Sequence, residues 1–166
     1  MNSRKKIARM AGFLYLMFLV TLIFAEDAVR SKLIVFGDGA ATANNIIAYE
    51  GLFRIGFMSD ILAGVLFLLT AWALYVLLRP VNKNIALLFL LLNLGGVAVQ
   101  CINMLNLFSA VLFLSGADYL NVFQADQLQA LALLYLELHK NGFMLYFIPK
   151  YFFIFGVTTI ILLAYL

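Results

Sequence analysis

Long apolar stretches separated by short polar segments dominate the pattern of hydrophobic and polar positions along this chain. The longest, Ile85–Gly116, has about 32 residues without a charged side chain, and as a helix it would be roughly 48 Å long. The hydrocarbon core of a bilayer is about 30 Å thick and needs about 20 apolar residues to cross. This stretch therefore predicts a membrane-spanning helix that is longer than the bilayer.

Further apolar stretches also have lengths typical of membrane-spanning helices. The pattern predicts an all-α integral membrane helix bundle, forming a single domain over residues 1–166. Its third and fourth helices are expected to be longer than the bilayer. The four predicted spans are residues 6–25, 53–78, 85–116 and 127–166, with 143–166 as the membrane part of the last.

The last apolar region has an alternative division. Residues 127–148 and 151–166 would then be two spans, making five in all, but this places a glutamate, the histidine and a lysine in lipid. The final span would also be only about 16 residues, shorter than the usual 17–25. Four spans are favoured, and Asn141-Gly142 is expected to interrupt the helix that begins near residue 127.

One face of the Ile85–Gly116 stretch is polar. Asn93, Gly96, Gln100 and Asn103 follow one another at helical spacing, so they form one stripe. Amides in hydrocarbon need hydrogen-bond partners, so this stripe is expected to face other helices or a wet cavity. Gly95 and Gly96 would let a neighbouring backbone approach closely.

The most polar segment is Glu26–Glu50. Gly37-Asp38-Gly39 is a turn signal, and Thr42–Phe53 has a helical pattern with Thr42 or Asn44 as its cap. Part of the segment is too apolar for a free linker. It is therefore expected to fold back onto the helix ends.

The composition agrees with a membrane protein. Apolar residues make up 66% and charged residues 11%, against about 45–50% and about 25% in soluble domains. A surface so poor in charge needs lipid to cover much of it. Cys101 is the only cysteine, which excludes an intrachain disulfide and paired-cysteine redox chemistry.

The basic residues indicate an orientation. The N-terminal segment and the turn at residues 79–84 together hold six basic residues and no acid, whereas most acids lie in the other loops. By the positive-inside rule, the N-terminus and this turn face the cytoplasm. The basic start followed by Ala11–Ala25 also resembles a signal peptide, but Ile23-Phe24 is bulky where cleavage needs small residues. An uncleaved first helix is favoured.

Five motifs stand out along the chain: ARMAGFLYL at 8–16, GDGAATANNIIAYEGLFRIGFMSD at 37–60, YVLLRPVNKN at 75–84, LFLSGADYL at 112–120 and QADQLQALALLYLELH at 124–139. Together they resemble the bacterial membrane family catalogued as domain of unknown function 4386. The resemblance covers residues 6 to 142 and implies a bacterial polytopic membrane protein in the cytoplasmic (inner) membrane, with no assigned reaction. This chain departs from the family's pattern in an uncharged third span, where members tend to carry an arginine, and in the sequence after Gly142. Members are also usually longer, with further spans.

Asp60 is the strongest candidate for a functional residue. It lies inside the second predicted span, between Gly56 and Gly64 one turn to either side. A charge within the membrane costs at least a few kcal/mol and therefore needs a reason. One reason is function; the other, which we favour, is a structural ion pair with Lys150 or Arg54 that fixes the packing.

Counting residues from the cytoplasmic turn places several polar side chains at one depth. Asp60 and Asn103 each lie about 18 residues, or about 27 Å, from that turn. Glu26 and Lys150 reach nearly the same level from the other two helices. We predict a polar layer that opens outward. The candidate ligand or ion residues are Glu26, Asp60, Asn93, Gln100, Asn103 and Lys150.

His139 is a weaker candidate. It is the only histidine, and Glu137 does not share its helix face. It is expected to lie at a helix end near the outer interface.

Two functions remain open. No serine-hydrolase elbow, zinc-protease motif or phosphate-binding loop occurs in the chain, so no catalytic residue, metal or cofactor is predicted. The first function is a non-enzymatic scaffold, regulator or binder of a lipid or small ligand. The second is a small transporter or permease-like protein that uses Asp60. The expected partners are membrane lipid and a small apolar or cationic ligand, but no nucleic acid, because no basic stripe with aromatic residues lies outside the spans.

Overall fold

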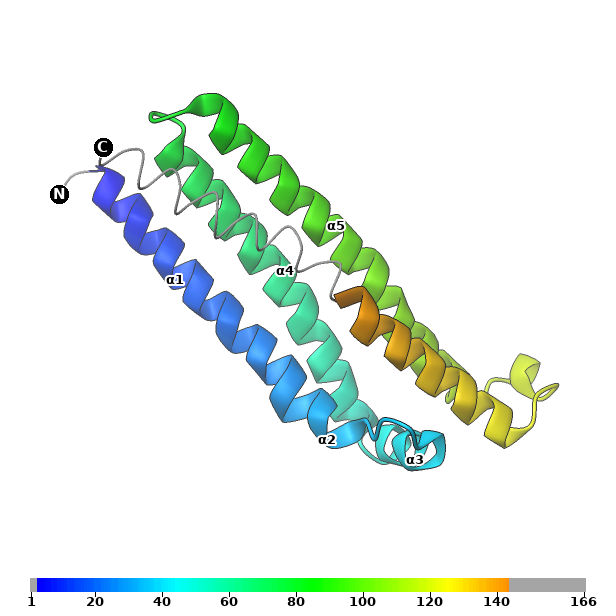
Figure 1. The fold of residues 1–166 in the computed structure, drawn as a ribbon. Helices are drawn as coiled ribbons and strands as arrows, with labels where there is room; N and C mark the ends of the chain where they lie inside the picture. Colours follow the sequence, from blue (N-terminus) through cyan, green and yellow to red (C-terminus); the bar gives the residue numbers. More distant parts are fainter. Residues whose placement is uncertain (1–2, 144–166) are drawn as a thin grey trace.

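The computed structural model describes residues 3–143, and every regular element among them is helical. Three long helices, α1 (Ser3–Ile23), α4 (Glu50–Leu78) and α5 (Lys83–Phe113), lie side by side (Figure 1). The middle one, α4, packs against both α1 and α5. A further helix, residues 125–143, lies along the second half of α5 and is yellow to orange in Figure 1. The predicted all-α helical bundle is confirmed.

Within residues 3–143, three stretches are long and apolar enough to cross a membrane: Arg4–Leu33, Glu50–Leu78 and Lys83–Phe113. Their outer faces carry large apolar side chains such as Phe13 and Ile102, which are 62% and 68% exposed. Such faces are costly in water and suit a lipid environment. The membrane part of the predicted fourth span lies, except for Phe143, outside the described residues.

The first helix is longer than predicted. A seven-residue π-helix, η1 (Phe24–Arg30), and the short α2 (Ser31–Leu33) continue α1 without a break. The expectation that this helix ends at Ala25 is therefore wrong. The reason is packing: Val29 and Leu33, one turn apart, are completely or almost completely buried among the other helices, so this part of the polar segment has an apolar face.

The segment between α2 and α4 folds back onto the helix ends, as predicted. It contains α3 (Gly39–Ala48), whose first turn is capped by the Asp38 carboxylate, which accepts a hydrogen bond from a backbone amide. The expectation that Thr42 or Asn44 provides the cap is wrong. Thr42 is instead buried, and its hydroxyl accepts a hydrogen bond from Val35 N at 2.9 Å and donates one to Val35 O at 3.0 Å.

The larger part of the apolar core lies at this end of the bundle. A 3₁₀ turn, η2 (Asp118–Leu120), lies between α5 and the helix of residues 125–143. That helix closes the core from the side of α5. The core combines residues from η1, α2, α3, α4, α5 and this helix, including Val29, Leu33, Ile46, Phe53, Leu107 and Leu136.

The polar stripe of α5 is buried, as predicted. Asn93, Gly96, Gln100 and Asn103 all lie on the inner face of the helix. Gly95, however, faces open space, so the close approach expected there does not occur among the described residues. Burial removes these three amides from water, yet Asn93 Oδ1 and Gln100 Oε1 have no hydrogen-bond partner among the described residues.

The expected interruption at Asn141-Gly142 is wrong, because the helix runs through both residues to residue 143. Gly142 lies against α5, where an added β-carbon would overlap Asn103 Oδ1 and lie 2.7 Å from its Cγ. The glycine therefore permits close contact between two helices and does not end one of them.

A second close contact brings η1 against α4. A β-carbon at Gly56 would lie 2.9 Å from Val29 Cγ1 and 3.2 Å from Val29 Cβ. We expect Gly56→Ala to lower the free energy of unfolding by about 1–2 kcal/mol, because the buried valine has little room to move. The matched control is Gly64→Ala on the same helix, where the nearest atom, Val97 Cγ1, is at 3.7 Å.

Chemical unfolding in detergent micelles measures the free energy of unfolding of both variants. The control should be neutral or slightly stabilising, because alanine favours a helix over glycine by about 1 kcal/mol. Equal stability of the two variants would contradict the close contact between Gly56 and Val29.

Candidate functional site

A buried ion pair joins the first helix to α4. The Arg30 guanidinium donates two hydrogen bonds to the Asp60 carboxylate, from Nη1 to Oδ2 and from Nη2 to Oδ1, the latter at 3.0 Å. Arg30 also binds Glu26, with Nη2 2.8 Å from Oε1 and Nε 3.1 Å from Oε2. The side chains of Arg30 and Asp60 are only 7% and 1% exposed, whereas Glu26 is 37% exposed. The fork geometry lets one cation bind two carboxylates.

Local structure explains how Arg30 reaches Asp60. The π-helix holds Glu26 and Arg30 four residues apart on one side, so that the glutamate steadies the guanidinium. Gly56, one turn before Asp60, lets the adjacent Val29 approach α4 closely. Arg30 was not among the residues predicted from the sequence.

A second polar contact joins α5 to the helix of residues 125–143. The Asn103 Nδ2 donates to the backbone carbonyl of His139 at 2.9 Å, and His139 Nδ1 lies 3.2 Å from the backbone carbonyl of Asn103. Asn106 donates to Asn103 Oδ1 at 3.0 Å, so the Asn103 amide is well held. His139 is 3% exposed and the helix continues past it to residue 143, so its expected place at a helix end is wrong. Close packing at Gly142, one turn further on, buries it.

These contacts fix the tautomer of the neutral imidazole. A carbonyl oxygen accepts hydrogen bonds and cannot donate them, so Nδ1 of His139 carries the hydrogen. Nε2 is then an unprotonated acceptor. It is buried and has no hydrogen-bond partner among the described residues.

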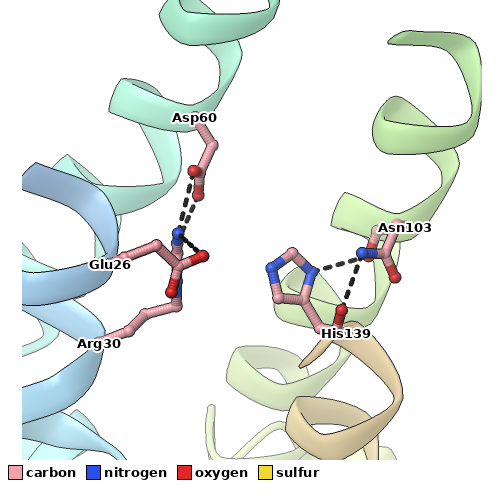
Figure 2. Close-up of polar contacts among 5 residues, drawn as sticks. All are labelled: Glu26, Arg30, Asp60, Asn103 and His139. Atoms are coloured by element: carbon pink, nitrogen blue, oxygen red, sulfur yellow. Dashed lines mark hydrogen bonds and ion pairs between the residues drawn. The ribbon is translucent and has the colours of Figure 1, made fainter. Parts of the chain in front are cut away.

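A cavity of about 240 Å³ lies between the two polar contacts. Figure 2 shows the imidazole between Asn103 on one side and the Glu26–Arg30 pair on the other, with its second ring nitrogen turned toward that pair. The inner wall includes the buried side chains of Arg30 and His139. The other described residues that line the cavity are Glu26, Asp27, Ser31, Ile34, Phe36, Leu136, Lys140 and Phe143.

The remaining candidates lie elsewhere. Lys150 is outside the described residues. Asn93 and Gln100 are buried on α5 but are not among the residues that line this cavity, and Asn93 Nδ2 donates to the Phe89 carbonyl of its own helix at 2.7 Å. Arg54 does not pair with Asp60: it binds Glu50 on the surface at 2.6 Å. Within residues 3–143 no group of three or more histidine, cysteine or acidic side chains is placed to hold a metal.

Burial lowers the pKa of the His139 imidazole below its ordinary value. The helix that carries His139 is not one of the three candidate spans among the described residues. The hydrogen bond to Asn103 opposes this effect, as do the carboxylates of Asp60 and Glu26, while the Arg30 guanidinium adds to it. The neutral form is therefore the favoured one in the folded protein at neutral pH. This agrees with the tautomer that the hydrogen bond selects.

We expect the folded protein to lose stability as the pH falls below about 6.5, the ordinary pKa of histidine. Below this pH the unfolded chain takes up a proton at His139 that the folded chain resists, so the free energy of unfolding falls. Thermal unfolding between pH 7 and about pH 5.5 measures the effect. The decrease should be smaller in His139→Gln, which does not titrate and leaves Arg30, Asp60, Glu26 and Lys140 in place. Equal slopes in both proteins would contradict the assignment.

Comparison with known proteins gives one match. A family model described as a domain of unknown function (DUF4386) matches residues 10–166. The match continues beyond Gly142, so the expectation that the resemblance ends near that residue is wrong. No curated protein and no solved structure matches the chain.

Proposed function

Because the chain belongs to the family described as domain of unknown function (DUF4386), which carries no assigned activity, we propose from the site itself that this protein is a membrane protein that binds a small ligand. The cavity between Arg30 and His139 is the binding site. The observation that carries the proposal is a buried acceptor without a partner among the described residues: it is Nε2 of His139, a residue that lines this cavity. Buried polar atoms are rarely left unsatisfied, so such an atom marks a place for a ligand or water.

We also propose the setting of this site. Residues 1–166 form one domain in the cytoplasmic membrane of a bacterium, with a cytoplasmic N-terminus, and residues 143–166 supply a fourth span. Three apolar helices and the basic residues at the N-terminus and in the turn at 79–84 support this orientation. The cavity then opens at the outer end of the bundle, and lipid covers the exposed apolar faces.

The geometry supports ligand binding over a transporter that uses Asp60. The Asp60 carboxylate is held by two hydrogen bonds from Arg30 and is 1% exposed. It is also absent from the described residues that line the cavity. A carboxylate held in this way has no free access for a proton or cation, so its role here is to position Arg30.

The size of the cavity limits the ligand. At about 240 Å³ it lies below the roughly 300–1,000 Å³ typical of drug-sized sites, so the ligand is small. Its walls combine the apolar side chains of Ile34, Phe36, Leu136 and Phe143 with polar groups. This combination suits an amphipathic molecule with a short apolar part.

Binding is tested with three straight-chain probes of equal length: octylamine, octanol and octanoate. At least one of them should raise the melting temperature of the wild-type protein in lipid nanodiscs, since a ligand of the folded state stabilises it. In Ser31→Trp an indole at the cavity lining should abolish this rise. Ser115→Trp, at an exposed position outside the cavity, is the matched control and should keep it. Equal shifts in wild type and Ser31→Trp for all three probes would reject this cavity as a binding site.

A further inference from the structure

The chemistry of the cavity selects among small ligands. Nδ1 of His139 donates to the Asn103 carbonyl, so Nε2 keeps a free lone pair, on the side of the ring that faces Glu26 and Arg30 (Figure 2). The partner of this atom must therefore bring a hydrogen-bond donor. A ligand that only accepts hydrogen bonds would leave Nε2 unsatisfied.

The charges around the cavity also favour a ligand that donates hydrogen bonds. Asp60 and Glu26 share the single cation Arg30, which leaves this cluster with one net negative charge. Asp27 on the rim adds a second negative charge, and the positive charge of Lys140 on the opposite rim offsets one of the two. The whole group is therefore negative, and Glu26 is its most accessible carboxylate, with 37% of its side chain exposed.

The cation on the rim is already engaged. Lys140 Nζ lies 3.9 Å from the centre of the Phe36 ring, in cation–π contact. Arg30 directs its nitrogens at two carboxylates. An anionic ligand would have to displace one of these contacts, whereas a cationic ligand can bind Glu26 without breaking any.

Building on the proposed function, we infer that the ligand is a small organic ammonium ion with N–H donors and a short apolar tail. Its N–H groups bind His139 Nε2 and the Glu26 carboxylate. The tail lies against the apolar walls formed by Ile34, Leu136 and Phe143. The charged ammonium then donates one hydrogen bond to the carboxylate and another to the neutral imidazole, and the second of these satisfies the buried acceptor.

The ligand class is tested by the dissociation constants of four probes for wild-type protein in nanodiscs. Octylammonium should bind at least about tenfold more tightly than octanol, which can donate to Nε2 but has no charge. Octanoate should bind more weakly still. Octyltrimethylammonium carries the same charge without an N–H donor, so it should bind about tenfold more weakly than octylammonium.

Two variants locate the contacts. Glu26 is partly exposed, and Glu26→Gln keeps the shape of its side chain. This variant should weaken the binding of octylammonium about tenfold and leave the binding of octanol nearly unchanged. His139→Phe removes the acceptor, so it should reduce the preference for octylammonium over octyltrimethylammonium, while the hydrogen bond to Glu26 keeps part of it. Because the probe comparison uses the wild-type protein, the inference stays testable if His139→Phe does not fold.

The outcomes separate this inference from the proposed function. If octanol or octanoate binds best and Ser31→Trp abolishes that binding, the cavity is a ligand site but not one for ammonium ions. If octyltrimethylammonium binds as tightly as octylammonium, the role of His139 Nε2 as an acceptor is wrong. If Ser31→Trp affects none of the probes, the proposed function itself fails.

Discussion

Replacing Arg30 with methionine is expected to lower the free energy of unfolding by about 3–5 kcal/mol, because it strands a buried carboxylate. Among the described residues Arg30 is the cation in contact with Asp60, whose side chain is 1% exposed. Asp60→Asn should cost less, about 1–3 kcal/mol, since Arg30 keeps Glu26, which water can reach. The order of these two losses distinguishes an Arg30-centred cluster from a simple pair.

The double variant Arg30→Met/Asp60→Leu provides the control. Two apolar side chains leave no buried charge, so its stability should lie near that of the wild type or above it. Chemical unfolding in detergent micelles measures the free energy of unfolding of the two single variants and of the double variant. If Asp60→Asn lowers the free energy of unfolding more than Arg30→Met does, Asp60 has another cationic partner. That result would overturn this account.

Replacing Gly142 with alanine should cost about 2–3 kcal/mol and should loosen the contact between α5 and the helix of residues 125–143. The added methyl group would overlap the Asn103 amide, which is held by hydrogen bonds to His139 and Asn106 and cannot turn aside freely. Either the helix shifts or these bonds break. Both outcomes expose His139.

The control for this substitution is Gly95→Ala on α5, where an added β-carbon meets nothing within 4 Å. It should be neutral or slightly stabilising through helix propensity, worth about 1 kcal/mol. Unfolding experiments give the stabilities, and the histidine ring proton shifts report exposure of His139. A Gly142→Ala protein as stable as Gly95→Ala, with an unchanged histidine signal, would show that Gly142 is not needed for close packing.

The main helices and the burial of the polar stripe could be predicted from the sequence because they depend on local periodicity. Asn93, Gly96, Gln100 and Asn103 repeat at helical spacing in an otherwise apolar stretch, and a helix can hide such a stripe only against other helices. Asp60 was found for a similar reason, since a carboxylate within an apolar run is conspicuous.

Arg30 could not be selected in the same way, because it lies in a segment whose many charges resemble a loop. Two signals were available: Glu26 and Arg30 are four residues apart, and so are Val29 and Leu33, as on one helix. The burial of His139 depends on which helix packs against it, and a single histidine carries no information about that. The partners that complete the candidate site are thus set by contacts between distant segments.

The π-helical turn at Phe24–Arg30 also makes the first helix sensitive to its exact residue count. Its hydrogen bonds join residues five apart instead of four, so the turn is wider than an α-helical turn and its bonding depends on every residue in it. A deletion or insertion here would change which residues are bonded and so disturb the place of Leu33 in the core. Insertions and deletions should consequently be excluded from this turn in functional relatives, while side-chain changes on its outer surface should be tolerated.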